Sequence, residues 1–431
     1  MRDRLGKHGS RERMEGEIIT IGSELISGRT LDFNAWYAAG RLTASGLRVT
    51  RITSVGDDFD AVSEALTRAL AASRFVIVTG GLGATEDDMT SEIVARALDR
   101  PLCLDKEMFS LLKSYTEDRG IRMTPSLEKM AWMPDGSRML NPEGRACGFA
   151  LTQEGVRLYF LPGVPDQMRY LMDKYVIPEL LDVYSTLPVI RQRVLKVFGL
   201  NEPGIAELFR GLKGEIGDVV LGFYPRFPEN HVTLSLRGAD EDSVSAELDR
   251  VEKNIRALLG AHVFGSENDT MAGVVGEALL EKGFTLGLAE SCTGGLIGHL
   301  VTETAGSSRY YRGGVMAYSD EVKATLLGVS RTTLERDGAV SEATIKEMAQ
   351  GVRRLRDVDL AVAVSGIAGP GGGTEAKPVG TVHLGLSVAG ETLAGRYRFW
   401  GTREQVKRQT AYMALDWVRR YLHGDPFLPG S

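Results

Sequence analysis

Apolar runs alternate with helical periodicities along the first 185 residues of the chain. The predicted strands and helices of this region are residues 17–21, 34–44, 48–53, 60–73 and 75–78. The run at 75–78 is apolar throughout, which is typical of a strand buried on both faces of a parallel sheet. Strand–helix alternation of this kind predicts a doubly wound α/β domain over residues 15–185. The charged and polar residues 1–14 before it predict a disordered tail.

The pattern changes after residue 183. Three short alternating segments predict strands at 194–197, 219–223 and 231–236, and a helical periodicity occupies residues 243–259. Linker-like sequences flank this region at 185–188 and 265–268. A small α+β domain is therefore expected over residues 186–268.

The α/β rhythm returns in the last third of the chain. Its predicted strands and helices are residues 272–282, 285–289, 294–303, 360–364, 380–386 and 402–422. This order predicts a second α/β domain, over residues 269–425.

Composition narrows the class of protein. The chain has 431 residues, 43% of them apolar and 25% charged, with a formal net charge of −6. These values are ordinary for a globular protein and give no indication of nucleic-acid binding. Three cysteines in no metal or disulfide pattern, and no apolar run of membrane-spanning length, predict a cytoplasmic protein that does not enter a membrane.

Ser291 follows the predicted strand at 285–289 and precedes Thr293, Gly294 and Gly295. Catalytic groups of open α/β sheets lie beyond the carboxyl ends of strands, and the first amides of a helix can hold an anion or an oxyanion. A serine becomes a nucleophile when a neighbouring group takes its proton. The simpler alternative is that Ser291 or Thr293 caps the helix that follows.

Tyr318 and Lys323 lie one structural unit further along. A lysine acts as a base when burial or neighbouring positive charge suppresses its own charge. Tyr318 would relay a proton or orient Lys323. A solvated lysine beside Asp320 and Glu321 is the alternative interpretation, and Asp320 is expected to have no part in the reaction.

A glycine-rich stretch follows the predicted strand at 360–364. Gly366, Gly369, Gly372 and Gly373 indicate a loop whose backbone approaches a ligand, with a flexible hairpin as the alternative. Arg403, near the start of the last helix, is a candidate for gripping a phosphate or is an ordinary surface arginine.

The N-terminal domain has a second candidate site. Glu24 and Asn34 follow the first strand, and the strand at 75–78 leads into a glycine turn. Aspartates at the start of the next helix either complement its dipole or hold a divalent cation beside a phosphate. The residues of this turn and helix start are Gly81, Gly83, Thr85, Asp87 and Asp88.

The C-terminal motifs resemble a known family. The stretches AESCTGG, RGGVMAYSDEVKATLLGV, GAVSE and VSGIAGPGGGTEAKPVGTV are similar to the nicotinamide-nucleotide deamidase domain of CinA proteins. The resemblance implies that Ser291 attacks the carboxamide of nicotinamide mononucleotide, with Lys323 and Tyr318 as base and relay, and without a cofactor. It also implies that both glycine segments and Ser341 surround the substrate, and that the protein is a homodimer.

The earlier segments extend this resemblance. GSELISG, TGGLGATEDDMT and LPGVP are similar to the MoaB/MogA-like molybdopterin-binding domain, a parallel-sheet α/β fold, and the middle segment resembles the KH-like α+β domain of CinA. In that family the first domain is associated with metal-dependent cleavage of ADP-ribose. The resemblance makes Asp87 and Asp88 metal ligands and adds Asn141 to the nucleotide site. Arg145 stands where the family has threonine, which puts that activity in doubt.

A function of another class is also compatible with the sequence. The chain would then be a nucleotide-binding regulatory or scaffold protein, linked to competence or DNA damage, with degenerate active sites. Intact Ser291, Tyr318 and Lys323 favour the enzyme, whereas the altered segment around Arg145 and Cys147 fits a degenerate N-terminal site.

Overall fold

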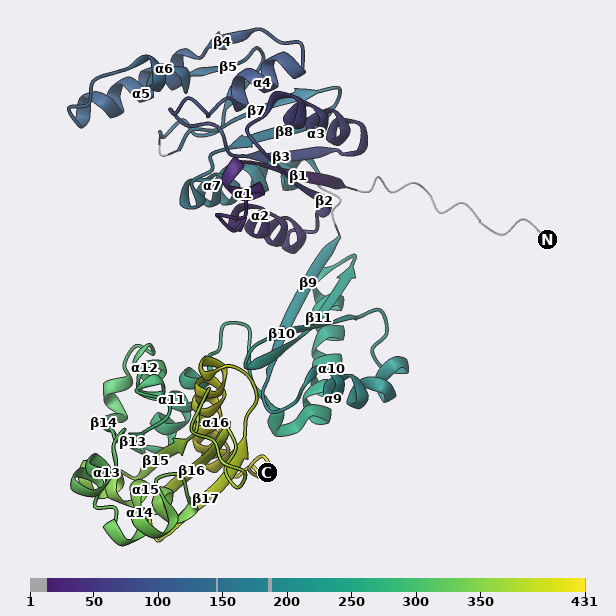
Figure 1. Ribbon diagram of the computed structural model, residues 1–431. Coiled ribbons are helices and arrows are strands. Elements are labelled where there is room, and N and C mark those ends of the chain that lie inside the picture. The colour runs from purple at the N-terminus through teal and green to yellow at the C-terminus, as the bar shows by residue number, and fades with distance from the viewer. Residues whose placement is uncertain (1–13, 145, 185–187, 431) are drawn as a thin grey trace. The chain divides into compact units, whose positions relative to one another are not determined.

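The computed structural model describes residues 14–144, 146–184 and 188–430 (Figure 1). The chain divides into two compact units. The first holds the residues up to Arg191 together with Arg237–Ser245, and the second holds Gln192–Leu236 and the chain from Ala246 onward. Each is described by itself.

The first unit is built on a six-stranded sheet in the order β2-β1-β3-β8-β7-β6. Its strands are β1 (Glu15–Ile21), β2 (Arg48–Val55), β3 (Phe75–Thr79), β6 (Arg138–Met139), β7 (Phe149–Gln153) and β8 (Val156–Leu161). Its helices are α1 (Ser23–Ile26), α2 (Phe33–Ala44), α3 (Phe59–Ala72), α4 (Thr90–Ala97), α5 (Lys106–Asp118), α6 (Pro125–Lys129), α7 (Pro165–Leu171), η1 (Met172–Val176) and α8 (Ile177–Val183). A separate ladder joins β4 (Leu102–Leu104) to β5 (Trp132–Pro134).

Strands β1, β2, β3 and β8 run parallel, as the sequence pattern predicts. Successive residues of β1 point to opposite faces of the sheet: Ile18 packs with α2, α7 and α8, and Ile19 packs with α3 and α4. Because both faces are covered, β3 is buried over its whole length. This explains why residues 75–78 are apolar without alternation.

The middle segment forms a four-stranded sheet in the order β10-β11-β9-β12. Its elements are β9 (Val189–Val197), α9 (Glu202–Phe209), η2 (Arg210–Gly214), β10 (Val220–Arg226), β11 (Glu229–Gly238), α10 (Glu241–Leu259), η3 (Gly260–His262) and β12 (Val263–Ser266). The linker predicted at 265–268 is partly wrong, since its first two residues belong to β12, which pairs with β9.

The C-terminal sheet has five strands in the order β14-β13-β15-β16-β17. Its strands are β13 (Leu286–Glu290), β14 (Tyr311–Met316), β15 (Leu360–Gly366), β16 (Thr381–Val388) and β17 (Glu391–Arg398). Its helices are α11 (Met271–Lys282), α12 (Leu296–Thr302), η4 (Ser307–Arg309), α13 (Asp320–Leu327), α14 (Arg331–Asp337), α15 (Glu342–Arg356) and α16 (Arg403–His423).

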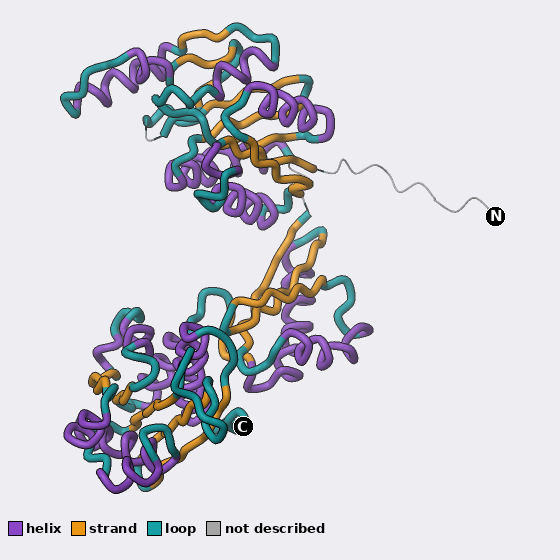
Figure 2. The backbone as a smooth tube through the Cα atoms, in the orientation of Figure 1, coloured by secondary structure: helices purple, strands orange, loops and turns teal. Residues whose placement is uncertain are grey.

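Helices cover both faces of this sheet (Figures 1 and 2). Alternate residues of β15 divide between the two layers: Val362 packs with α11 and α16, and Ala363 packs with α15. Strand β13 is parallel to both β14 and β15, whereas β16 and β17 continue as an antiparallel meander. Since β16 reverses the direction, β17 again points the same way as β13.

A buried ionic cluster fastens the last helix within the second unit. Asp416 of α16 has no exposed surface and accepts hydrogen bonds from Arg419 and Arg420. Both guanidinium groups also donate to the carbonyl oxygen of Ala261, at 2.5 and 3.0 Å, in the turn before β12. The cluster therefore joins α16 to the end of the middle segment.

We predict that Asp416→Asn lowers the free energy of unfolding by roughly 3–5 kcal/mol, because it takes the counter-charge from buried Arg420 and leaves buried Arg419 only the partly exposed Asp425, 3.8 Å away. The melting temperature, followed by circular dichroism, measures the effect. Glu404→Gln on the same helix is the control, since its ion pair with Arg408 is exposed to solvent. Equal melting temperatures for the two variants would contradict this account of the cluster.

Candidate active site

Four chain segments meet at one edge of the C-terminal sheet. The strands β13, β14 and β15 are parallel, so the residues that follow their carboxyl ends lie at the same edge. The segment after β17 reaches this edge too. The predicted residues Ser291, Tyr318, Gly369 and Arg403 stand in these four segments. The chain leaves β13 toward β14 on one side and returns to β15 on the other, so Ser291 lies at the switch point of the sheet.

Ser291 begins a tight turn between β13 and α12. Its N–H donates to the carbonyl oxygen of Val364 at 3.1 Å, which fixes it beside β15. The turn closes with the N–H of Gly294 donating to the carbonyl oxygen of Ser291. Gly294 and Gly295 have φ of 62° and 91°, which explains the glycine pair because other residues rarely adopt these angles. Within the described chain, the hydroxyl of Ser291 makes no hydrogen bond.

The start of α12 is already occupied by a side chain that the sequence analysis did not select. Glu290 accepts hydrogen bonds from the N–H groups of Ile297 and Gly298, at 3.1 and 2.8 Å. It also accepts from the hydroxyl of Thr293, at 2.7 Å. The prediction that the first amides of this helix are uncovered is therefore wrong for Ile297 and Gly298. Thr293 is fully buried, and its hydroxyl faces Glu290.

Lys323 is buried, with 1% of its surface exposed. Its ammonium group donates to the carbonyl oxygen of Tyr318 at 3.4 Å and lies 3.5 Å from Oδ1 of Asp320. The solvated-lysine alternative is thus wrong. The carboxylate of Asp320 thus contacts the side chain predicted to be the base, and the expectation that Asp320 has no part in the reaction stays a prediction.

Tyr318 is exposed and precedes α13, which begins after the cap residue Ser319. Its hydroxyl accepts a hydrogen bond from Arg403 at 3.1 Å, and Arg403 also donates to the carbonyl oxygen of Gly369 at 2.6 Å. Arg403 therefore ties the loop after β14 to the glycine loop after β15. A Cβ on Gly294 would lie 3.7 Å from Nζ of Lys407, so a second cation of α16 reaches the Ser291 turn.

Positive charge near the Ser291 turn also acts on the adjacent thiol. Burial, and to a smaller degree the charge of Glu290, raise the pKa of Cys292 to about 12, even though Arg403 and Lys323 act in the opposite direction. Both cations are thus close enough to influence the residue next to Ser291. The thiol itself stays protonated at neutral pH.

The glycine loop after β15 is packed more tightly than the sequence suggests. A Cβ on Gly366 would lie 2.8 Å from the carbonyl oxygen of Thr381, and one on Gly373 would lie 2.7 Å from the N of Val379. These two glycines therefore allow close packing of the backbone, a role that their interpretation as ligand-approaching glycines did not include. Gly372 has φ of 85°, and a Cβ added to it would lie 3.7 Å from the nearest atom, in the side chain of Ile367. The role of Gly372 in binding stays a prediction.

Ser341 caps α15 and lies at the edge of an open pocket of about 600 Å³. Its hydroxyl donates to the carbonyl oxygen of Gly338 at 3.0 Å and accepts from the N–H of Thr344 at 3.2 Å. Lys346 and Lys377 also line this pocket. The hydroxyl of Ser341 thus has a structural role, and its contact with a substrate stays a prediction.

His383 of β16 is a buried titratable group that the sequence analysis did not select. Its side chain is almost enclosed, and burial, followed by the positive charges of Arg396 and Lys377, lowers the pKa of its imidazole to about 4. Glu342 acts weakly in the opposite direction. The imidazole is therefore neutral at physiological pH.

We predict that His383 makes the fold less stable in acid. The pKa is about 4 in the folded protein and 6.5 in the reference state, so the unfolded chain takes up the proton first. This contribution is constant above pH 6.5, and on the order of 3 kcal/mol is lost as the pH falls toward 4. Melting temperatures across this range should fall less steeply for His383→Gln than for His299→Gln, in which the replaced histidine is exposed. Parallel curves would refute the assignment.

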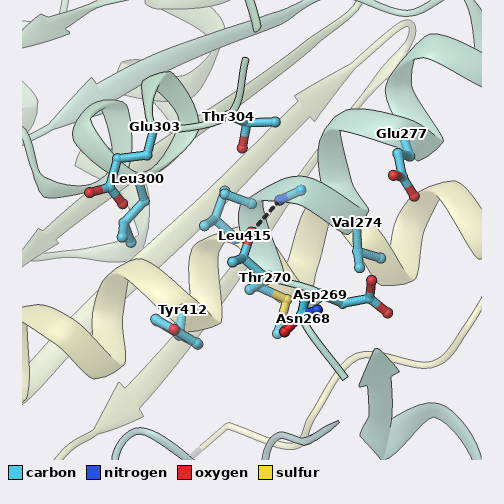
Figure 3. A pocket seen from close by; sticks show the side chains of 13 residues that line it. Asn268, Asp269, Thr270, Val274, Glu277, Leu300, Glu303, Thr304, Tyr412 and Leu415 are labelled. Atoms are coloured by element: carbon cyan, nitrogen blue, oxygen red, sulfur yellow. Dashed lines mark hydrogen bonds between the residues drawn. The ribbon is translucent and has the colours of Figure 1, made fainter. Parts of the chain in front are cut away.

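A separate pocket of about 370 Å³ lies between α11, α12 and α16 (Figure 3). Its lining includes Thr270, Glu277, Glu303 and Tyr412. None of the residues predicted for the deamidase site lines it.

The N-terminal candidates also gather at one edge of a parallel sheet. Asn34 donates to the hydroxyl of Thr79 at the end of β3 and to the carbonyl oxygen of Gly163 after β8. Glu24 is exposed after β1, and Gly81 follows β3. Asn141, in contrast, is fully buried and bonded to Ala146, so it supports its own loop.

The acidic pair of this domain is bound to a threonine. The hydroxyl of Thr85 donates to Asp87 and to Asp88, and this bond lowers the pKa of Asp87. Asp88 also covers Gly83, where a Cβ would lie 2.3 Å from its carboxylate. Within the described residues, no group of three or more His, Cys, Asp or Glu side chains has an arrangement that could hold a metal ion. Cleavage of ADP-ribose and a divalent metal stay predictions, and Arg145 lies outside the described residues.

The middle segment contains a Gly-x-x-Gly sequence, from Gly211 to Gly214, in the turn between α9 and β10. Such a turn clamps single-stranded nucleic acid in KH domains. Arg210 before it is paired with Glu207, and Glu215 follows it. This charge balance adds no support for nucleic-acid binding. Within the part of the chain that the structure describes, no helix is both long and apolar enough to cross a membrane.

Comparison with protein families gives three adjoining matches. The CinA C-terminal domain matches residues 268–422, the probable molybdopterin binding domain matches residues 17–182, and the damage-inducible protein CinA KH domain matches residues 192–265. This order of domains confirms the predicted fold class, with an α/β domain at each end and a KH-like α+β domain between them.

Two relatives that align over nearly their whole length are named CinA-like proteins. A CinA-like protein of Desulfotalea psychrophila is 39% identical over 413 residues, which cover 96% of this chain and 100% of the relative. A CinA-like protein of Syntrophotalea carbinolica is 41% identical over 94% of this chain and 98% of the relative. The crystal structure of competence damage-inducible protein A from Klebsiella pneumoniae is 38% identical and covers 36% of this chain and 95% of that one, with a TM-score of 0.35. The chain belongs to the CinA family.

Proposed function

We propose that the C-terminal domain is an amidohydrolase that converts nicotinamide mononucleotide to nicotinic acid mononucleotide and ammonia, in the recycling of pyridine nucleotides. The observation that carries this proposal is the burial of Lys323 at the sheet edge where Ser291 begins its turn. A lysine enclosed by the fold at this place is not a surface charge. Its enclosure suits a Ser–Lys hydrolase, since Ser291 is also buried, at 8% exposed, and its hydroxyl has no hydrogen-bond partner among the described residues.

The reaction assigned to these groups is an acyl transfer to Ser291 followed by hydrolysis. Oγ of Ser291 bonds to the carboxamide carbon while its proton passes to Lys323. Lys323 then gives this proton to the amide nitrogen of the tetrahedral intermediate, and ammonia leaves as the C–N bond breaks. Water attacks the resulting ester, which releases the pyridine carboxylate and restores the serine. Lys323 donates to the carbonyl oxygen of Tyr318 in this structure, so it must exchange that partner to reach the serine proton.

Cationic and polar groups around the turn supply the rest of the proposed site. Arg403 and Lys407 provide positive charge for the phosphate of a mononucleotide. Tyr318 is held by Arg403 at the entrance and serves as the relay. The proposal involves no metal in the reaction.

The test is ammonia release from nicotinamide mononucleotide by the full chain in the presence of EDTA. Ser291→Ala should lower kcat by at least about 10³-fold, since it removes the nucleophile. Binding of the nucleotide, measured by calorimetry, should survive in this variant. Lys323→Met, which keeps an apolar stem of similar length, should be impaired to a similar degree.

The outcomes separate the enzyme from the regulatory alternative. Release by the wild type alone supports the amidohydrolase. Nucleotide binding without ammonia release from folded wild-type protein would sink the enzymatic proposal and favour a binding role. Loss of activity on addition of EDTA would refute the metal-free mechanism.

A further inference from the structure

Glu290 is a buried carboxylate immediately before the proposed nucleophile. It has 4% of its surface exposed and lies at the last position of β13. Its two oxygens divide three hydrogen bonds: Oε2 accepts from Thr293 and Ile297, and Oε1 accepts from Gly298. A buried carboxylate is costly to desolvate, and donors on both oxygens offset that cost.

We propose that Glu290 is a positioning residue: it holds the turn that begins at Ser291 in one conformation, so that the serine is aligned for attack. This inference rests on the proposed amidohydrolase function. The side chain of Glu290, which immediately precedes the serine, is hydrogen-bonded to Thr293, two places after the serine, and to the first turn of α12. The chain at Ser291 is therefore held between two fixed points. Its third restraint is the hydrogen bond from its own N–H to Val364.

The same contacts define the part played by Thr293. Its hydroxyl is buried and donates to Glu290 at 2.7 Å, so it acts within the turn. The side chain of Thr293 therefore positions the turn and does not contact the substrate. Because the amides of Ile297 and Gly298 are also taken by Glu290, donors to an oxyanion must come from the turn ahead of them.

Positioning and direct binding affect the kinetics differently. A group that touches the substrate in the ground state changes KM, whereas a group that only aligns the nucleophile changes kcat. A nucleophile displaced by about 1 Å costs on the order of 10²-fold in rate. Loss of a restraint on Ser291 should therefore lower kcat and leave KM nearly unchanged.

The first test is Glu290→Gln in the full chain. Glutamine has the shape of glutamate, but its NH₂ group would face an N–H donor of α12, so at least one hydrogen bond is lost. We expect kcat for nicotinamide mononucleotide to fall about 10- to 100-fold, with KM within about 3-fold of the wild type. The melting temperature shows whether the variant folds.

A second pair of variants leaves the carboxylate in place. Thr293→Val removes the hydroxyl without changing the shape and should lower kcat about 10-fold, whereas Thr293→Ser restores the donor and the rate. Thr302→Val is the matched control, because it removes a hydroxyl bonded to the carbonyl oxygen of Gly298 at the far end of α12. It should leave kcat unchanged even if it lowers the melting temperature.

The results that overturn the proposal are specific. A rise in KM at unchanged kcat for Thr293→Val would make Thr293 a substrate contact. A fall in kcat for Thr302→Val equal to that of Glu290→Gln would make the effect one of helix stability alone. Wild-type kcat in a folded Glu290→Gln variant would show that the serine needs no such restraint.

An assay without nicotinamide mononucleotide separates this proposal from the proposed function. A fluorophosphonate probe phosphonylates an activated serine hydroxyl with loss of fluoride, and mass spectrometry locates the product. If the wild type is labelled at Ser291 but releases no ammonia, the substrate is wrong, and slower labelling of Glu290→Gln still supports positioning. Equal labelling of both proteins refutes positioning, and a wild type that is not labelled at Ser291 refutes both proposals.

Discussion

The parallel pairing of β13 with both β14 and β15 is the constraint on which the candidate active site depends. It brings the segments that hold Ser291, Tyr318 and Gly369 to one edge of a sheet, although residues 291 and 369 are 78 positions apart in the sequence. The meander from β15 through β16 and β17 then returns the chain to that edge, where α16 begins. Arg403 therefore reaches Tyr318 and Gly369, in the segments that follow β14 and β15, at the edge where Ser291 begins its turn.

Buried charge has two different functions in the second unit. At Asp416 one carboxylate is paired with two guanidinium groups, and the cluster joins α16 to a distant turn, which is a structural use. At the sheet edge the charges are kept apart: Glu290 is satisfied by backbone and hydroxyl donors, and Lys323 by a carbonyl oxygen with an exposed carboxylate nearby. Lys323, with its two long contacts, can exchange partners during a reaction, whereas the arginines bonded to buried Asp416 are held in place.

Much of the fold and part of the site could be predicted from the sequence. Strand β3 was readable because burial on both faces makes a continuous apolar run, and Ser291 because glycines in left-handed conformations follow it. The role of Glu290 was hidden, since its partners are amides seven and eight residues later that look the same in every sequence. The sequence did suggest Lys323 beside Asp320, but only as a solvated lysine, because no local pattern shows that the fold encloses this side chain. The glycines after β15 were misread because their close neighbours come from the segment around β16, which no local pattern reveals.

The two candidate sites differ in how their polar groups are satisfied, and this difference bears on which of them is prepared for chemistry. At the N-terminal edge, Asp87 and Asp88 share the hydroxyl of Thr85, so a ligand must first break bonds within the loop. At the C-terminal edge, the restraints lie behind the turn, in Glu290, and the hydroxyl of Ser291 has no partner among the described residues. Preorganised groups cost little reorganisation when the transition state forms. The turn at Ser291 is therefore held ready for the proposed reaction, in which Lys323 must still change its partner, whereas the N-terminal loop would have to rearrange before it held a metal or a phosphate.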